Sequence, residues 1–176
     1  TANLDWLTIS STGAIVEHPK GKPIIVAAGP NENTPAVSAY NQIEAEDLIC
    51  YHVLRTSDGK GNGEGRFISN MKNGSYSSYM INFGPGENKS LNLQARLSAV
   101  KPGQIEIRLD SVAGKLIGTL DYDTTGTNQS EFFTKECKVN APDGVKHVFL
   151  VYKMDKEVKY HNSAPSVNLN WIKFIK

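Results

Sequence analysis

The chain is dominated by short runs in which apolar and polar residues alternate, and this period of two constrains the fold more than any other feature. In the run LNLQARLSAV, residues 91–100, every second residue from Leu91 to Ala99 is apolar. Successive side chains of a β-strand point to opposite faces, so the pattern predicts a strand with one buried face. Similar runs occupy residues 43–46, 76–83, 104–111, 115–122, 131–139, 145–153 and 168–176, with turn-forming segments between most of them. This spacing predicts an all-β fold, a β-sandwich of two antiparallel sheets.

Residues 1–39 differ from the rest of the chain. LDWLTIS and KPIIVAA can each form a strand, whereas the following GPNENTPAVSAYNQ contains the Pro and Asn residues of a linker. A chain of 176 residues has the size of one well-buried domain. We therefore predict a sandwich over residues 40–176, preceded by an edge hairpin or the tail of an upstream domain over residues 1–39.

Charge and hydropathy exclude several classes of partner. Nineteen basic and eighteen acidic residues leave a formal charge of +1, and no basic run is interleaved with aromatic residues. Nucleic acid is therefore not an expected partner. No stretch approaches the roughly 20 apolar residues that a membrane-spanning helix needs, so no membrane span is expected. The N-terminal TANLDWLTIS lacks the basic and apolar regions of a leader, which does not exclude secretion of a processed protein.

The two cysteines, Cys50 and Cys137, belong to no CxxC or Cys/His cluster with metal-binding spacing. The sequence spacing therefore indicates neither a zinc motif nor a redox motif. Two cysteines can form one disulfide in an oxidising compartment, or remain free thiols, and we favour free thiols.

Two acids, Glu44 and Glu46, lie one residue apart in the segment IEAED. Side chains two residues apart on a strand share a face, about 7 Å from each other. Such a pair can be the solvated edge of a strand, a ligand pair for a hard cation such as calcium, or a catalytic pair. A second pair, Glu106 and Asp110, lies opposite the apolar face of its run and resembles an ordinary solvated sheet face.

An ordered set of motifs resembles the family 6 carbohydrate-binding modules: IEAED, GRFISNMKNGSYSSYMINF, QIEIRLDSVAGKLIGTLDYDTTG, VKHVFLVYK and NLNWIKF. The resemblance spans roughly residues 42–176. It implies a β-sandwich of jelly-roll type that binds plant or algal polysaccharide and is usually tethered to a glycoside hydrolase. The segment DWLTISSTGAIVEHPKGKPIIV faintly resembles the end of a family 43 glycoside hydrolase domain, several of which carry such a module at the C-terminus.

The resemblance also implies a structural calcium ion. In the family, the first acidic strand and the last strand hold this ion, and the matching side chains here are Glu44, Glu46 and Asn170. Backbone carbonyls of the Arg66 loop and of Asn168 are expected to complete its shell. Carboxylate and amide oxygens are hard ligands that suit calcium.

The resemblance places Phe67 and Asn168 at the family's sugar cleft, and Glu64 beside the cleft loop. Phe67 falls at the stacking position, and its alternative role is that of a core aromatic residue. Asn168 matches a sugar-binding asparagine, and Glu64 either accepts sugar hydroxyl groups or is a solvated surface residue. A second aromatic residue, a tryptophan, usually follows the TGG turn, and Asn128 or the adjacent Gln129 replaces it here. This loss predicts a weaker, altered or inactive cleft.

Three functions follow from these observations. The favoured one is a secreted, extracellular, cell-surface or periplasmic module, without catalytic activity, that binds xylan or β-glucan and targets an attached glycoside hydrolase. The second is an enzyme that uses an acid pair, and no nucleophile elbow or histidine metal spacing supports it. The third is a structural module that has lost sugar binding and braces a neighbouring catalytic domain.

Overall fold

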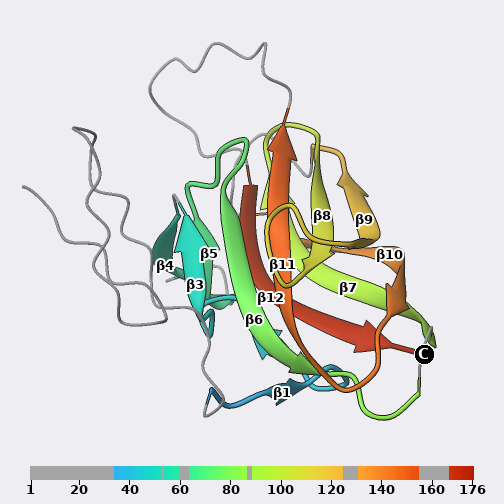
Figure 1. Ribbon diagram of the computed structural model, residues 1–176. Coiled ribbons are helices and arrows are strands. Elements are labelled where there is room, and N and C mark those ends of the chain that lie inside the picture. The colour runs from blue at the N-terminus through green and yellow to red at the C-terminus, as the bar shows by residue number, and fades with distance from the viewer. Residues whose placement is uncertain (1–33, 53, 60–63, 87–88, 125–130, 155–166) are drawn as a thin grey trace, which may run out of the picture.

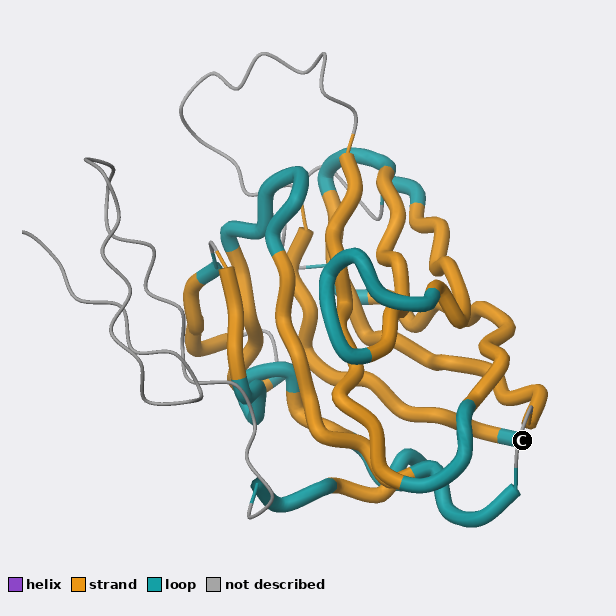
Figure 2. The backbone as a smooth tube through the Cα atoms, viewed as in Figure 1, coloured by secondary structure: helices purple, strands orange, loops and turns teal. Residues whose placement is uncertain are grey.

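The computed structural model describes residues 34–52, 54–59, 64–86, 89–124, 131–154 and 167–176. These ranges contain strands and loops and no helix (Figure 2). The strands are β1 (Val37–Ser38), β2 (Ile43–Glu44), β3 (Cys50–His52), β4 (Arg55–Gly59), β5 (Gly65–Ser69), β6 (Tyr76–Asn82), β7 (Lys89–Ala99), β8 (Gly103–Leu109), β9 (Leu116–Tyr122), β10 (Phe133–Ala141), β11 (Val145–Met154) and β12 (Val167–Ile175).

The strands form one curled sheet whose two halves face each other. In the first half, β6 pairs with β1, β3 and β11, and β8 lies between β11 and β9. In the second half, the order is β10, β7, β12, β5 and β4, and β2 also pairs with β12. Figure 1 shows β6 and β11 in front of β7 and β12. All pairings are antiparallel except that of β1 with β6, so the predicted β-sandwich is confirmed.

The core lies between the two halves and follows the alternation seen in the sequence. Every second side chain of β7 is buried, and Leu93 and Leu97 are at most 1 % exposed. The facing half contributes Tyr79, Ile81 and Ile107, which are also at most 1 % exposed. Burial of these apolar surfaces is the main favourable term in folding, which explains why a period of two predicted these strands.

The sheet begins earlier than the predicted boundary at residue 40. Strand β1 pairs in parallel with β6, and Ala39 is fully buried. The Ala39 N–H donates to the Asn82 carbonyl at 3.0 Å, and its carbonyl accepts from the Phe174 N–H at 2.9 Å. Residues 37–39, which the sequence assigned to a linker, are therefore part of the sandwich. The strands predicted within residues 1–33 lie outside the described residues.

The last strand contains a β-bulge that changes which side chains face the core. Leu169 pairs with Leu97, but Trp171 pairs with the next residue, Arg96, so Asn170 is the extra residue of β12. Before the bulge, odd-numbered residues such as Leu169 face the core, and after it Ile172 does so. Bulges bend a strand and redirect a side chain, and here the redirected side chain is that of Asn170.

We expect the junction of the two halves to be sensitive to one added methyl group at Gly118. This residue pairs with Val139 where β9 meets β10. A Cβ atom there would lie 2.8 Å from the Lys138 carbonyl oxygen and 2.9 Å from Val139 Cγ2. Gly118→Ala should therefore lower the free energy of unfolding by about 1–3 kcal/mol in urea denaturation. Thr119→Val, on the neighbouring half-buried position, should change it by less than about 0.5 kcal/mol. Equal stability of the two variants would contradict the expected crowding.

Candidate functional site

Phe67, Phe132 and Asn168 form an aromatic and amide row on the outer face of the second half of the sandwich. Leu169 of β12 pairs with Ile68 of β5, and both side chains are fully buried. Because neighbouring residues of a strand point to opposite faces, Phe67 and Asn168 lie on the outer face, on either side of this pair. The Asn168 amide Nδ2 donates to the Ser98 hydroxyl of β7 at 3.1 Å. The structure thus brings two predicted sugar-site residues onto one face of adjacent strands.

Phe132 is the residue of this row that the sequence analysis missed. Its ring lies against that of half-buried Phe67, with centroids 5.3 Å apart and planes at 62°, an edge-to-face contact. Phe132 is 7 % exposed, whereas the adjacent Phe133 is 46 % exposed. The pair FF at the end of a polar turn was a signal that one of the two rings faces the site. Asn128, the position where the family tryptophan is missing, lies outside the described residues.

Glu64 is ion-paired with Arg96 and is not simply a solvated surface residue. Its carboxylate accepts two bonds from the Arg96 guanidinium, Nη2 to Oε1 at 2.5 Å and Nε to Oε2 at 3.1 Å. The two side chains are 15 % and 29 % exposed. Paired, planar bonds of this kind fix orientation, so Glu64 is held in place beside the start of β5.

A cluster of oxygen atoms surrounds the bulge at Asn170. The Asn170 amide Nδ2 donates to the carbonyl oxygens of Glu64 at 2.6 Å and Arg66 at 2.7 Å. The backbone carbonyl of Asn170 accepts from the backbone N–H of Ala45 at 2.9 Å. Ala45 lies between Glu44 and Glu46, the two predicted acidic ligands. The β-bulge therefore brings the acidic segment and the Arg66 loop to the same place in the fold.

The sequence predicted that Glu44 and Glu46 both lie on a strand, but only Glu44 does. Strand β2 ends at Glu44, and the Asp47 N–H donates to the Glu44 carbonyl at 3.1 Å in a turn. Glu44 Oε1 accepts from Gln42 Nε2 at 2.8 Å. Glu46 Oε2 is buried and has no hydrogen-bond partner among the described residues. A buried carboxylate oxygen without a partner is costly unless a cation or a proton compensates it.

These groups fit the donor set that a hard cation needs. The described residues hold no group of three His, Cys, Asp or Glu side chains suited to a metal ion, so any shell here includes amide and carbonyl oxygens. Carbonyl oxygens of Glu64 and Arg66 converge, and Asn170 can present its amide oxygen after a half-turn of its side chain. Asn168, whose backbone carbonyl was the other predicted contributor, lies two residues before the bulge, and its side-chain amide donates to Ser98.

A hydrogen bond from Tyr79, a core residue, links the acidic segment, residues 44–47, to the core. Its hydroxyl group donates to the Ala45 carbonyl at 2.8 Å. Burial raises the pKa of Tyr79, and the nearby carboxylates of Glu46 and Asp47 raise it further. The phenol therefore stays neutral and remains a donor at any ordinary pH.

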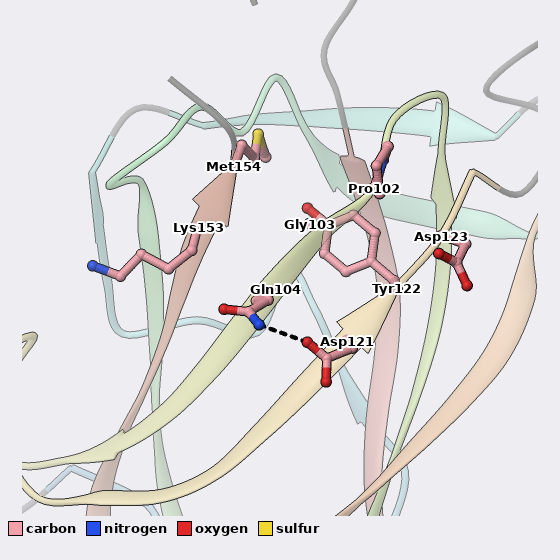
Figure 3. Close-up of a pocket in the computed structure, with 8 residues that line it drawn as sticks. All are labelled: Pro102, Gly103, Gln104, Asp121, Tyr122, Asp123, Lys153 and Met154. Carbon is pink, nitrogen blue, oxygen red and sulfur yellow. Dashed lines mark hydrogen bonds between the residues drawn. The ribbon is translucent and has the colours of Figure 1, made fainter. Parts of the chain in front are cut away.

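The outer face of the first half carries charged side chains around an open pocket of about 420 Å³ (Figure 3). The Gln104 amide Nε2 donates to Asp121 Oδ1 at 2.7 Å across its floor. Beside it, Glu106 pairs with Arg108 at 3.0 Å and Lys153 at 3.6 Å. The Arg108 bond lowers the pKa of Glu106, with help from Lys153.

Glu106 is consequently poorly placed as a general acid. Its lowered pKa keeps it ionised, and both of its cationic neighbours are already paired with it. Asp110 lies after the end of β8 with a positive φ of 65° and is exposed. Glu106 therefore belongs to an ion-paired surface and Asp110 is an exposed residue, as expected from the sequence.

A partly buried aromatic ring and a buried amide on one outer face of a β-sandwich are groups that ligand-binding sites use. The profile of the family described as "Carbohydrate binding module (family 6)" matches residues 44–176. The chain therefore belongs to carbohydrate-binding module family 6. Members of this family are non-catalytic binding modules, so the prediction that this chain alone is not an enzyme is confirmed.

Known relatives agree with this assignment. A family 6 module from Clostridium cellulolyticum, solved in complex with xylose, is 35 % identical, with a TM-score of 0.67 over 80 % of this chain and 100 % of that chain. A β-1,3-glucan-binding family 6 module from Bacillus halodurans is 26 % identical, with a TM-score of 0.70 over 81 % of this chain and 100 % of that chain.

One curated relative is much longer than this chain. An arabinoxylan arabinofuranohydrolase from Bacillus subtilis (strain 168) is 31 % identical over 120 residues, which are 66 % of this chain and 23 % of that protein. The chain thus spans less than a quarter of that relative. Among the described residues, no helix has the length and apolar character that crossing a membrane requires.

Removing the Tyr79 hydroxyl should destabilise the fold through the acidic segment. Tyr79→Phe leaves the Ala45 carbonyl without its side-chain donor, and we expect a loss of about 1–2 kcal/mol in urea denaturation. Tyr40→Phe is the matched control, because the Tyr40 hydroxyl makes only a 3.4 Å contact with the Phe83 carbonyl. If Tyr40→Phe lowered the free energy of unfolding as much as Tyr79→Phe, the effect would not come from the hydrogen bond to Ala45.

Proposed function

We propose that this chain binds a β-linked plant polysaccharide of the xylan or β-glucan class at the aromatic and amide row. The observation that carries the proposal is the placement of half-buried Phe67 on the same outer face as Asn168, in a chain that belongs to a carbohydrate-binding family. The relatives solved with xylose or described as binding β-1,3-glucan support these two glycan classes.

The chemistry of the row suits a sugar ring. A pyranose presents an apolar C–H face, which an aromatic ring can cover, and hydroxyl groups that an amide can pair with as donor or acceptor. Phe132 contacts Phe67 edge-to-face and so holds the orientation of its ring. One wall built this way gives fewer contacts than a sandwich of two parallel aromatic rings, so the affinity should be modest.

The same proposal includes targeting of an attached glycoside hydrolase in a secreted protein. Support comes from the arabinoxylan arabinofuranohydrolase, in which a region similar to this chain makes up 23 % of the length. A tethered binding module raises the effective concentration of a catalytic domain at an insoluble polymer, even when the module binds weakly. An extracellular location follows, because polymers of this size are degraded outside the cell.

A structural brace for a neighbouring domain is the second candidate function. The commitment of the Glu64 carboxylate to Arg96 favours it, since an ion-paired acid has less capacity for sugar hydroxyl groups. The two candidates differ in one measurable property. A brace shows no saturable sugar binding, whereas a binding module does.

We further propose that the oxygen cluster at Asn170 holds a structural calcium ion. Glu44, Glu46, the Asn170 amide and the Arg66 carbonyl would hold it, and the buried Glu46 Oε2 atom supports the proposal. The ion would supply positive charge that compensates this carboxylate. It would join the segment after β2 to the bulge of β12, so its effect should be on stability.

Titration with xylohexaose, cellohexaose and laminarihexaose tests the sugar site. We expect saturable heat with at least one of them, and Phe67→Ala should weaken that binding at least about tenfold, which corresponds to about 1.4 kcal/mol of lost contact. Phe133→Ala is the control, because Phe133 is exposed on the opposite face of its strand. Absence of heat with the folded protein would favour the brace, and equal loss in both variants would move the site away from Phe67.

Thermal unfolding with calcium or with a chelator tests the ion. A concentration 100 times the Kd contributes about 2.7 kcal/mol, which raises Tm by about 5–10 °C in a chain of this size. Glu46→Gln should remove most of this increase and should not destabilise the chelated protein, since it neutralises an uncompensated buried charge. Glu136→Gln, an exposed acid bonded to Gln94, should keep the increase. A calcium response that survives in Glu46→Gln would contradict the assignment.

A further inference from the structure

Strand β4, which lies beside β5 at one end of the strand order, places Arg55 on the same face as Phe67 (Figure 1). Ser57 of β4 pairs with Phe67 of β5. Two residues along each strand, Arg55 pairs with Ser69. Directly paired residues share a face, so Arg55 and Phe67 are diagonal neighbours. Such neighbours are about 7–8 Å apart, a separation that a long side chain can cross.

A contact between two hydroxyl groups confirms that these residues share a face. Ser57 Oγ lies 2.8 Å from Ser69 Oγ, across the two strands. Ser69 is 8 % exposed, so this contact lies close to the sheet. The Arg55 side chain, in contrast, is exposed. Arg55 therefore extends from the edge of the face that carries Phe67.

Arg55 differs from the other arginines of the chain in its partners. The other three each pair with an acid: Arg66 with Asp58 at 3.6 Å, Arg96 with Glu64 at 2.5 Å and Arg108 with Glu106 at 3.0 Å. Among the residues that the structure describes, no acid forms an ion pair with Arg55. A guanidinium group keeps its charge at any ordinary pH and offers five N–H donors. Arg55 is thus a permanent cation whose donors remain available.

The acids of strands β4 and β5 and of the position before β5 do not balance this charge. Asp58 directly follows Ser57, so it points to the opposite face, where it pairs with Arg66. The Glu64 carboxylate accepts two bonds from Arg96. The face that carries Phe67 therefore keeps a positive charge near its aromatic ring.

We propose that Arg55 selects glycans that carry a carboxylate group, as a uronic acid branch on a β-linked xylan backbone does. This inference rests on the proposed binding of polysaccharide at the aromatic and amide row. A backbone sugar covers Phe67, and an acidic branch extends across β5 toward β4. The planar fork of the Arg55 guanidinium then donates to both oxygens of the carboxylate.

The competing interpretation is that Arg55 only protects the edge of the sheet. Among the described strands, β4 pairs with β5 alone, and charged side chains on an edge strand discourage pairing with other chains. This role requires a charge but no particular position relative to Phe67. It also predicts equal binding of acidic and neutral sugars, so a comparison of the two separates the interpretations.

The experiment titrates the calcium-loaded chain with xylohexaose and with xylohexaose that carries a glucuronic acid branch. At low ionic strength the acidic sugar should bind about three- to fivefold more tightly, as expected for one exposed ion pair. Added salt should reduce this advantage, because it screens the pair. Arg55→Gln should abolish the advantage and leave the affinity for xylohexaose nearly unchanged. Arg55→Lys should retain part of it, since lysine keeps the charge but lacks the fork.

Two further variants locate the effect. Lys138→Gln removes the same charge from an exposed position of β10 paired with Asn92, and it should keep the full advantage. Phe67→Ala should weaken the binding of both sugars, because both cover the same ring. Circular dichroism of each variant verifies folding. Binding of the acidic sugar that does not depend on Phe67 would overturn the inference, because the branch would then be bound elsewhere.

The remaining outcomes separate this inference from the proposed function. Equal affinity of the parent chain for the two sugars would overturn the inference and leave the sugar site intact. An advantage that survives in Arg55→Gln, or an equal loss of both sugars in that variant, would do the same. Absence of binding to either sugar by the folded chain would reject the proposed function and this inference together.

Discussion

The pairing of β12 with β7 on one side and with β5 on the other is the interaction on which the rest of the structure depends. This strand is hydrogen-bonded to β7 along most of its length, to β5 near its start and to β2 further along. It supplies core side chains such as Leu169 and Phe174, both fully buried. The bulge at Asn170 lets one strand meet two requirements, because it keeps apolar residues inward on both sides of a redirected amide.

The two outer faces of the sandwich are chemically different, although one curled sheet provides both. The second half presents Phe67, Phe132 and Asn168, an apolar surface with a buried amide. The first half presents paired charges, such as Glu106 with Arg108, and the hydrogen-bonded side chains of Ser78 and His147. A β-sandwich separates such functions easily, because each strand offers one face to the core and leaves the other free to vary.

Much of the fold followed from the sequence because burial imposes a period of two on each long strand. Strands β6 to β12 coincide with the alternating runs to within a few residues. The two-residue strands β1 and β2 are too short for any period to specify, and they depend on partners far along the chain. Ala39, for example, is fixed by bonds to residues 82 and 174.

The sites were predictable only where the family resemblance fixed a position. Phe67 and Asn168 could be named in advance, but the contact of Phe67 with Phe132 depends on strand order, which the spacing of residues does not reveal. Cys50, Ser78 and His147 show the same limit. They are separated by 28 and 69 residues along the chain, so no local motif marks their contact.

The central position of β12 also determines the order in which the molecule can be assembled during synthesis. The apolar face of β7 is complete once Ala99 has been made, but its neighbour β12 begins only at Val167, more than sixty residues later. Until then β7 and β5 keep unpaired edges, and the bulge that gathers the oxygen cluster does not exist. Long-range pairing of this kind folds slowly and leaves strand edges open to other chains. The nascent module therefore exposes those edges until β12 is made, and loss of the β12 segment would remove the aromatic and amide row and the oxygen cluster together.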